Sequence, residues 1–137
     1  MDSRYGRRVA SGDLAALRNA LLAVHGALLE GDRIEIERFR GRMSAGELLQ
    51  AAIDDPWFAW LRPISELTVQ IDEALAEAAS GGEPVPESES ERLTEAARDL
   101  FAPPKPDTAF GKRYLDALQR HPEVGMAQGA LMRVLNA

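Results

Sequence analysis

The chain has 137 residues, a mass of 15.0 kDa, 45% hydrophobic residues, 28% charged residues and a formal net charge of −6. Its length and composition fit one globular domain and exclude a chain that is disordered throughout. Its apolar runs span only a few residues, so we expect no segment that crosses a bilayer. Because there is no cysteine, disulfides, thiolate zinc sites and thiol catalysis are excluded within this chain.

The acidic charge bears on partners and location. A negative domain repels phosphate backbones and anionic lipid, so we expect neither nucleic acid nor a membrane as a partner. Mild basic excesses in residues 1–12 and 105–120 are typical of solvated faces. Asp13, Arg18 and Asn19 interrupt the first apolar run, which argues against a signal peptide and favours a cytoplasmic protein. Fourteen arginines against two lysines suggest a bacterial origin.

The first predicted element is an amphipathic helix over residues 13–30. Ser11 or Asp13 can cap its start, and Gly31 stands where a left-handed C-terminus is expected. Its apolar residues recur at steps of three and four, as in Leu14, Leu17, Leu21, Val24 and Leu28.

Residues 32–43 are harder to assign. Residues 34–37 alternate apolar and charged side chains, as in a short strand, but one isolated strand would have nothing to pair with. We therefore interpret this segment as a helix or an irregular connector.

Two helices and a turn should follow. Ser44 and Glu47 form a capping box that begins a helix ending near residue 54. Asp55-Pro56 restarts the chain in a short aromatic turn, and Pro63 begins a helix that ends near Ala79, before Ser80-Gly81-Gly82.

Residues 80–90 are predicted to form a flexible acidic loop, because their glycines, prolines and acids give them no reason to pack. A second capping box at residues 88–91 begins a helix that ends before a stiff proline-rich break at 103–106.

Two helices complete the chain. Asp107 or Thr108 caps the first, and His121-Pro122 separates it from the last. The sequence thus predicts an all-α fold, a single-domain bundle of about five to seven helices over residues 1–137, with no sheet.

The aromatic segment at residues 54–63 is the best candidate for a binding surface. Trp57 and Trp60 are three residues apart, Arg62 can stack on them, and Asp54 and Asp55 supply acceptors. The competing interpretation is a buried corner, since a short helix that is apolar on nearly all sides normally fills the space between longer helices.

The segment Asp-Pro-Trp-Phe-Ala-Trp-Leu-Arg-Pro-Ile-Ser at 55–65, with Ile71-Asp72-Glu73, resembles small bacterial all-helical proteins of uncharacterised function. Residues 113–120 are similar to the same group. The resemblance implies an all-α fold and supplies no activity, cofactor or catalytic residue.

Catalytic and metal-binding patterns are missing from the sequence. The only histidines, His25 and His121, are far apart and lie outside Glu-x-x-His or His-x-x-x-His pairs. No nucleophile motif or phosphate loop occurs. We therefore predict no catalytic, cofactor-binding or metal-ligating residues. These patterns favour a non-enzymatic protein over an enzyme.

The segment Phe110-Gly111-Lys112-Arg113-Tyr114 is the best nucleic-acid candidate, because basic and aromatic residues interleave. Phe110 and Tyr114, however, share one helical face and are typical of a core. The acidic net charge also disfavours this function.

Two functions remain in competition. The first is a non-enzymatic helical domain for protein contacts, including self-association, with Leu22 and Leu29 as candidate interface residues outside the main stripe. The second is a small-molecule-binding protein or enzyme with a pocket lined by Trp57, Trp60, Tyr114 and Arg62.

Overall fold

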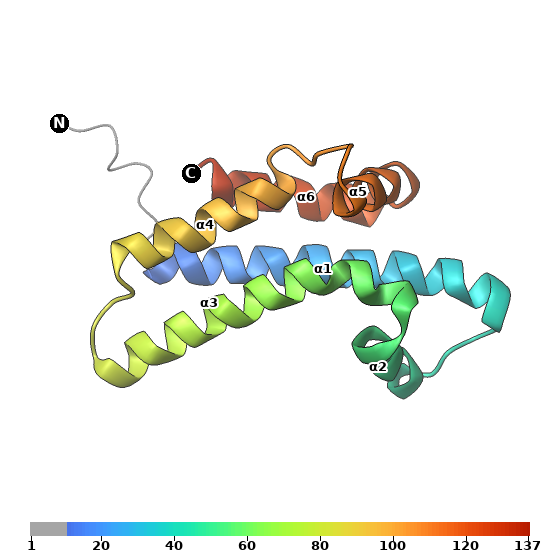
Figure 1. Ribbon diagram of the computed structural model, residues 1–137, viewed down its shortest axis with the longest axis horizontal. Coiled ribbons are helices and arrows are strands. Elements are labelled where there is room, and N and C mark those ends of the chain that lie inside the picture. The colour runs from blue at the N-terminus through green and yellow to red at the C-terminus, as the bar shows by residue number, and fades with distance from the viewer. Residues whose placement is uncertain (1–10) are drawn as a thin grey trace.

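The computed structural model describes residues 11–137, and this part of the chain contains six α-helices, one 3-10 helix and no strand (Figure 1). The elements are α1 (Ser11–Arg40), α2 (Ala45–Asp54), η2 (Pro56–Leu61), α3 (Arg62–Gly81), α4 (Glu87–Phe101), α5 (Ala109–Arg120) and α6 (Pro122–Leu135). The predicted all-α bundle is confirmed. No described helix is both long enough and apolar enough to cross a membrane. The basic excess predicted at residues 1–12 and the cap at Ser11 lie outside the described side chains.

Helix α1 is longer than the sequence suggested. It continues through Gly31 to Arg40, so the predicted stop at Gly31 is wrong. Of the two interpretations of residues 32–43, the helix is confirmed as far as Arg40 and the irregular connector is not. The buried stripe runs on from Leu28 to Asp32 and Ile36 in steps of four, and these three side chains all face the interior. The left-handed residue after the helix is Gly41, with φ of 82°.

The other helices are arranged around α1. Helix α3 runs antiparallel to it, as shown by the ion pair of Arg18 with Asp72 and the contact of His25 with Ser65. Helix α6 packs along another side of α1, and α4 and α5 close the bundle (Figure 1). The core includes Leu14, Leu17, Leu21, Val24, Leu28, Phe58, Ile64, Ile71, Leu93, Phe101, Tyr114 and Leu131.

The connector between α3 and α4 is shorter and more packed than predicted. Helix α4 begins at Glu87 with Pro86 at the N-cap, so the capping box predicted at residues 88–91 is wrong. Ser90 instead faces the core, and its hydroxyl has no hydrogen-bond partner among the described residues. Val85 is also buried, which contradicts the expectation that nothing in residues 80–90 packs.

Other predicted helix boundaries are confirmed. Ser44 Oγ accepts from the Glu47 N–H at 3.1 Å, and the Glu47 carboxylate accepts from the Ser44 N–H at 2.9 Å. Thr108 caps α5 by accepting from the Gly111 N–H. Proline occupies the first turn of α3 and α6.

Candidate functional site

The residues predicted for the binding surface and its pocket include Asp55, Trp57, Trp60, Arg62 and Tyr114, and the structure does not bring these five together. Trp57 and Trp60 face α1 and α5 through their contacts with Asp32 and Arg113. Arg62 instead lines a groove on a different side of η2. The short 3-10 helix therefore supplies two different surfaces rather than one.

Both indole N–H groups donate to one residue of α1, Asp32. Trp60 Nε1 donates to Asp32 Oδ2 at 2.7 Å, and Trp57 Nε1 donates to the main-chain oxygen of the same residue at 3.3 Å. Asp32 itself is buried. Both indole N–H groups therefore have a hydrogen-bond acceptor within the protein.

The cation over the indoles is Arg113 of α5, where the sequence suggested Arg62. Its guanidinium carbon lies 4.9 Å from the Trp60 ring centre and 5.5 Å from that of Trp57, within cation–π range. Its Nη2 lies 3.6 Å from Asp32 Oδ2. We call Asp32, Trp57, Trp60 and Arg113 the indole corner. The charged and hydrogen-bonding groups of the indole corner interact with one another, so the corner is a structural contact between α1, η2 and α5.

Burial raises the pKa of the Asp32 carboxyl, although the Trp60 N–H and the Arg113 charge act in the opposite direction. Perturbed carboxyls of this kind occur at functional sites and in structural networks alike. Here one carboxylate oxygen, Oδ2, already accepts from Trp60 and lies near Arg113, which favours the structural role.

Tyr114 belongs to the core, so the prediction that it lines a binding surface is wrong. Its ring is fully buried between Phe101 and Phe110, with centre-to-centre distances of 5.0 Å and 5.8 Å. Its hydroxyl donates to Gln128 Oε1, and burial raises its pKa. Because Phe110 and Tyr114 pack inward, the segment at 110–114 cannot present interleaved aromatic and basic side chains to nucleic acid.

Asp55 fixes the start of η2. One carboxylate oxygen accepts from the Trp57 N–H at 2.9 Å, and the other accepts from Arg40 Nη1 at 2.5 Å. The Arg40 hydrogen bond, followed by that of the Trp57 N–H, lowers the pKa of this carboxyl. Asp55 thus joins the end of α1 to the aromatic turn and does not project toward a ligand.

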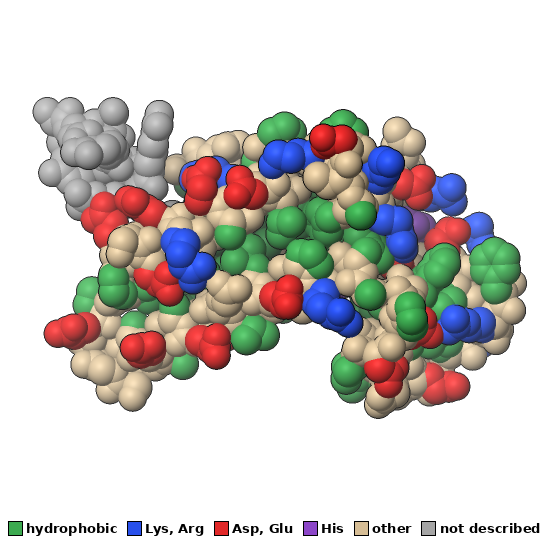
Figure 2. Space-filling model, in the orientation of Figure 1, with side chains coloured by type: hydrophobic (Ala, Val, Ile, Leu, Met, Phe, Trp, Pro, Cys, Tyr) green, Lys and Arg blue, Asp and Glu red, His purple; other side chains and the backbone are tan. Residues whose placement is uncertain are grey.

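Arg62 lies on a groove between α1, α2, η2 and α3 with a volume of about 320 Å³. We call this cavity the α2 groove. It is lined by His25, Leu49, Ala52, Ile53, Phe58, Ala59, Leu61, Arg62 and Ser65. Arg62 is exposed on it and has no ion-pair partner among the described residues. Figure 1 places α2 beneath the start of α3, and Figure 2 shows the outline of the molecule hollowed beside α2.

Helix α2 covers little of its own apolar surface. Only Ala51 of its ten residues is buried, whereas Leu49 and Ile53 are 65% and 64% exposed on the rim of the groove. These two residues are four apart and share one face of the helix. The sequence predicted this helix and its capping box, but it could not show that the apolar face of the helix is left open.

The open apolar surface continues along α1 and α3. Leu22 is 42% exposed and Val69 55% exposed. On α1, Leu22 lies between Arg18 and His25 in the sequence. On α3, Val69 lies between Ser65 and Asp72, which contact His25 and Arg18 across the two helices. Of the two residues predicted to lie outside the main stripe of the first helix, Leu22 is exposed, while Leu29 is partly buried and packs against the core.

The histidines have local packing partners. His25 Nε2 and the Ser65 hydroxyl share a hydrogen bond of 3.2 Å, and burial lowers the pKa of His25. The ring of His121 lies against Gly31, so close that a Cβ there would be 2.7 Å from His121 Cδ2. Within residues 11–137, no group of three or more histidine, aspartate and glutamate side chains is placed to hold a metal ion.

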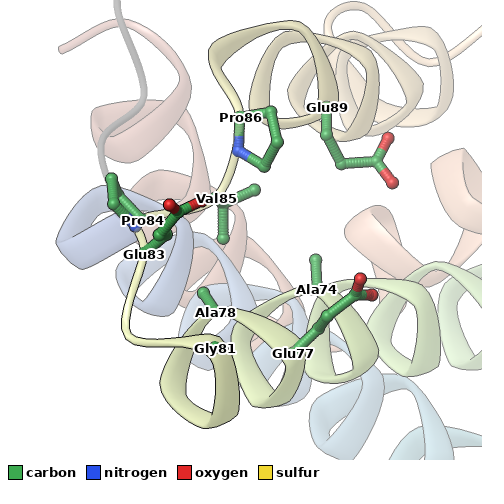
Figure 3. A pocket seen from close by; sticks show the side chains of 9 residues that line it. All are labelled: Ala74, Glu77, Ala78, Gly81, Glu83, Pro84, Val85, Pro86 and Glu89. Carbon is green, nitrogen blue, oxygen red and sulfur yellow. The ribbon is translucent and has the colours of Figure 1, made fainter.

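A second cavity of about 340 Å³ lies between α3, α4 and their connector (Figure 3). Val85 points from the connector toward Ala74 and Ala78, while Glu77, Glu83 and Glu89 lie around its opening. Glu89 is paired with Arg92 at 2.6 Å. The sequence did not predict this cavity because it depends on the packing of Val85.

Comparisons with protein-family models, curated proteins and solved structures found no match for this chain. The resemblance of residues 55–65 and 113–120 to small bacterial helical proteins therefore stays a prediction. Any statement of function must therefore rest on the residues that lie together at the α2 groove rather than on a relative.

Proposed function

We propose that this protein is a non-enzymatic helical interaction domain that binds an amphipathic helical segment in the α2 groove. The observation that carries this proposal is the open apolar face of α2, with Leu49 and Ile53 about two-thirds exposed beside a groove. Contiguous exposed apolar surface with a polar rim is typical of interaction sites.

The chemistry of the groove indicates what kind of segment fits it. Phe58, Leu61 and Ala52 provide an apolar floor and wall for side chains at i and i+4 of a docked helix. Arg62 on the rim favours a segment that carries a carboxylate, since this guanidinium lacks an ion-pair partner in the described part of the chain. Cytoplasmic location stays an expectation from the interrupted apolar run near the N-terminus, and bacterial origin stays an expectation from composition.

Site-specific photocross-linking tests the proposal. A benzoylphenylalanine placed at position 49 in the native host should cross-link to a protein, and an added Arg62→Glu substitution should abolish the product. The same photoreactive residue at position 126 is the matched control, because Met126 is 75% exposed but lies on α6, away from the groove. Equal cross-linking from both positions, or none from position 49, would contradict the proposed function.

A second candidate function is small-molecule binding in the same groove, because its volume of about 320 Å³ is within the range of ligand sites. Arg62, His25 and Ser65 would supply the polar contacts. Native mass spectrometry of protein purified from its own host should then show added mass that Arg62→Glu removes. Binding at the two tryptophans is less favoured, because their N–H groups are already used by Asp32.

A further inference from the structure

The cavity of about 340 Å³ between α3, α4 and their connector, which we call the α3–α4 cavity, lies at the end of the molecule opposite α2 (Figure 1). We infer that this cavity binds the basic segment formed by residues 1–10 of the same chain, which precede the described part. The inference is independent of the proposed function. The charge of the cavity, its apolar floor and its position beside the start of α1 support it.

The charge of the cavity is not balanced within the described part of the chain. Residues 72–91 run through the second half of α3, the connector and the start of α4, and they contain seven acidic residues and no lysine or arginine. At the cavity itself, Glu89 is paired with Arg92, but Glu77 and Glu83 have no ion-pair partner among residues 11–137. Because like charges repel one another, this surface favours a cationic partner.

The charge of residues 1–10 is complementary to this surface. These residues contain Arg4, Arg7 and Arg8 against one acid, Asp2. Arginine pairs with carboxylates through two parallel hydrogen bonds, so each of these side chains can pair with a glutamate at the opening of the cavity.

The floor of the cavity is apolar. Val85 is only 8% exposed and points from the connector toward Ala74 and Ala78 (Figure 3). A simple cation would leave this floor uncovered, whereas a peptide that carries an aromatic side chain among its arginines covers it. Tyr5 directly follows Arg4 in the sequence and provides such a side chain, with an apolar ring and a polar tip.

The cavity is within reach of this segment. The two cross-helix contacts of α1 with α3 fix an antiparallel register that brings Ser11 level with Ala79. Ala79 follows Ala78, which lines the cavity. The seven residues from Ser11 back to Arg4 span up to about 23 Å when they are extended. Attachment this close to the site raises the effective concentration of the segment, so contacts that are individually weak suffice.

Paramagnetic relaxation enhancement in the full chain tests the inference. Because the chain has no cysteine, Ser3→Cys gives a single attachment point for a spin label. The label should broaden the amide signals of Ala78 and Val85 and leave that of Leu49, on α2, unchanged. When the spin label and the isotope label are carried by different copies, no broadening should appear, because binding occurs within one chain.

Charge reversal distinguishes binding from mere attachment near the cavity. Arg4→Glu, Arg7→Glu and Arg8→Glu together should remove most of the broadening, although the segment keeps its length. Adding Glu77→Lys and Glu83→Lys should restore it, because the two charges are then exchanged. The amide spectra also show whether each variant keeps its fold.

Glu66→Lys and Asp107→Lys are the matched control, because both residues are exposed and neither lines the cavity. Added to the charge-reversed segment in place of Glu77→Lys and Glu83→Lys, they should restore nothing. The inference is overturned by a wild type without broadening at Val85, by broadening that survives reversal of the arginines or appears between copies, or by a control that restores it equally.

Discussion

At the scale of single residues, Asp32 is the most informative position. Its side chain accepts from Trp60, lies near the guanidinium of Arg113 and is buried on α1. A buried carboxylate destabilises the folded state unless it is paired. The pKa of Asp32 is raised, so the effect of burial outweighs that of the favourable partners. The residue therefore provides an essential acceptor while its charge opposes folding.

Replacing Asp32 should separate these two effects. A raised native pKa means that the native state holds the proton more tightly than the unfolded chain, so the contribution of this group to stability falls as pH rises from its unfolded pKa through its native pKa. Asp32→Asn keeps an acceptor for Trp60 without the charge, so its stability relative to the wild type should rise between pH 3 and pH 7. Urea denaturation at several pH values measures this difference.

Asp32→Ala is the matched control for the acceptor. It leaves the part-buried Trp60 N–H without its acceptor and should lower the free energy of unfolding by about 1–3 kcal/mol. A difference between Asp32→Asn and the wild type that does not change with pH would refute the assignment of a buried, costly charge.

At the scale of elements, the length of α1 depends on contacts made within its second half. Gly31 has a low helix propensity, yet the helix passes through it, and the ring of His121 occupies the space that a Cβ at this position would need. The indole corner holds the next residue, Asp32. The second half of α1 is thus stabilised by η2 and by the start of α6.

Alanine substitutions at two glycines of α1 should have opposite effects. Gly26→Ala meets open space and should stabilise the protein by about 0.5–1 kcal/mol through helix propensity. Gly31→Ala should destabilise it, since the added Cβ would lie 2.7 Å from the His121 ring. Thermal or urea denaturation gives both values.

A double-mutant cycle identifies the cause. In a His121→Ala background the ring is gone, so Gly31→Ala should become stabilising, as Gly26→Ala is. If Gly31→Ala stabilises the wild type just as much, the close approach of His121 does not determine that position.

At the scale of the whole molecule, α1 contacts α3, α4, α5, α6 and η2, so a single helix links most of the core. This arrangement favours one cooperative unit, consistent with the single domain predicted from length. Helix α2 is coupled only weakly to this core, because it contacts mainly η2 and buries only one residue.

One cooperative unit should unfold in one transition. Both tryptophans lie at the indole corner, so their fluorescence reports the packing of α1, η2 and α5, whereas far-UV ellipticity reports all helices. The two urea transitions should have the same midpoint and slope. A fluorescence change at clearly lower urea would show that this corner melts independently of the bundle.

The sequence alone determined the all-α class and most helix boundaries, because caps, prolines and apolar spacing are local signals. Ser44, Asp55, Thr108 and Pro122 lie at helix starts as predicted. Local rules failed at Gly31, where the helix continues past the predicted stop, and at Ser88, whose predicted capping box with Glu91 does not form because α4 begins at Glu87.

Only the tertiary structure decided which side chains form a site. Arg113 and Asp32 are distant in sequence from the tryptophans that they contact, so no spacing rule pairs them. Arg62, adjacent in sequence to the same aromatic turn, lies on a different surface with Leu49 and Ile53. The physical reason is that local sequence sets the conformation of each helix, while the direction that each face points depends on packing against helices elsewhere in the chain.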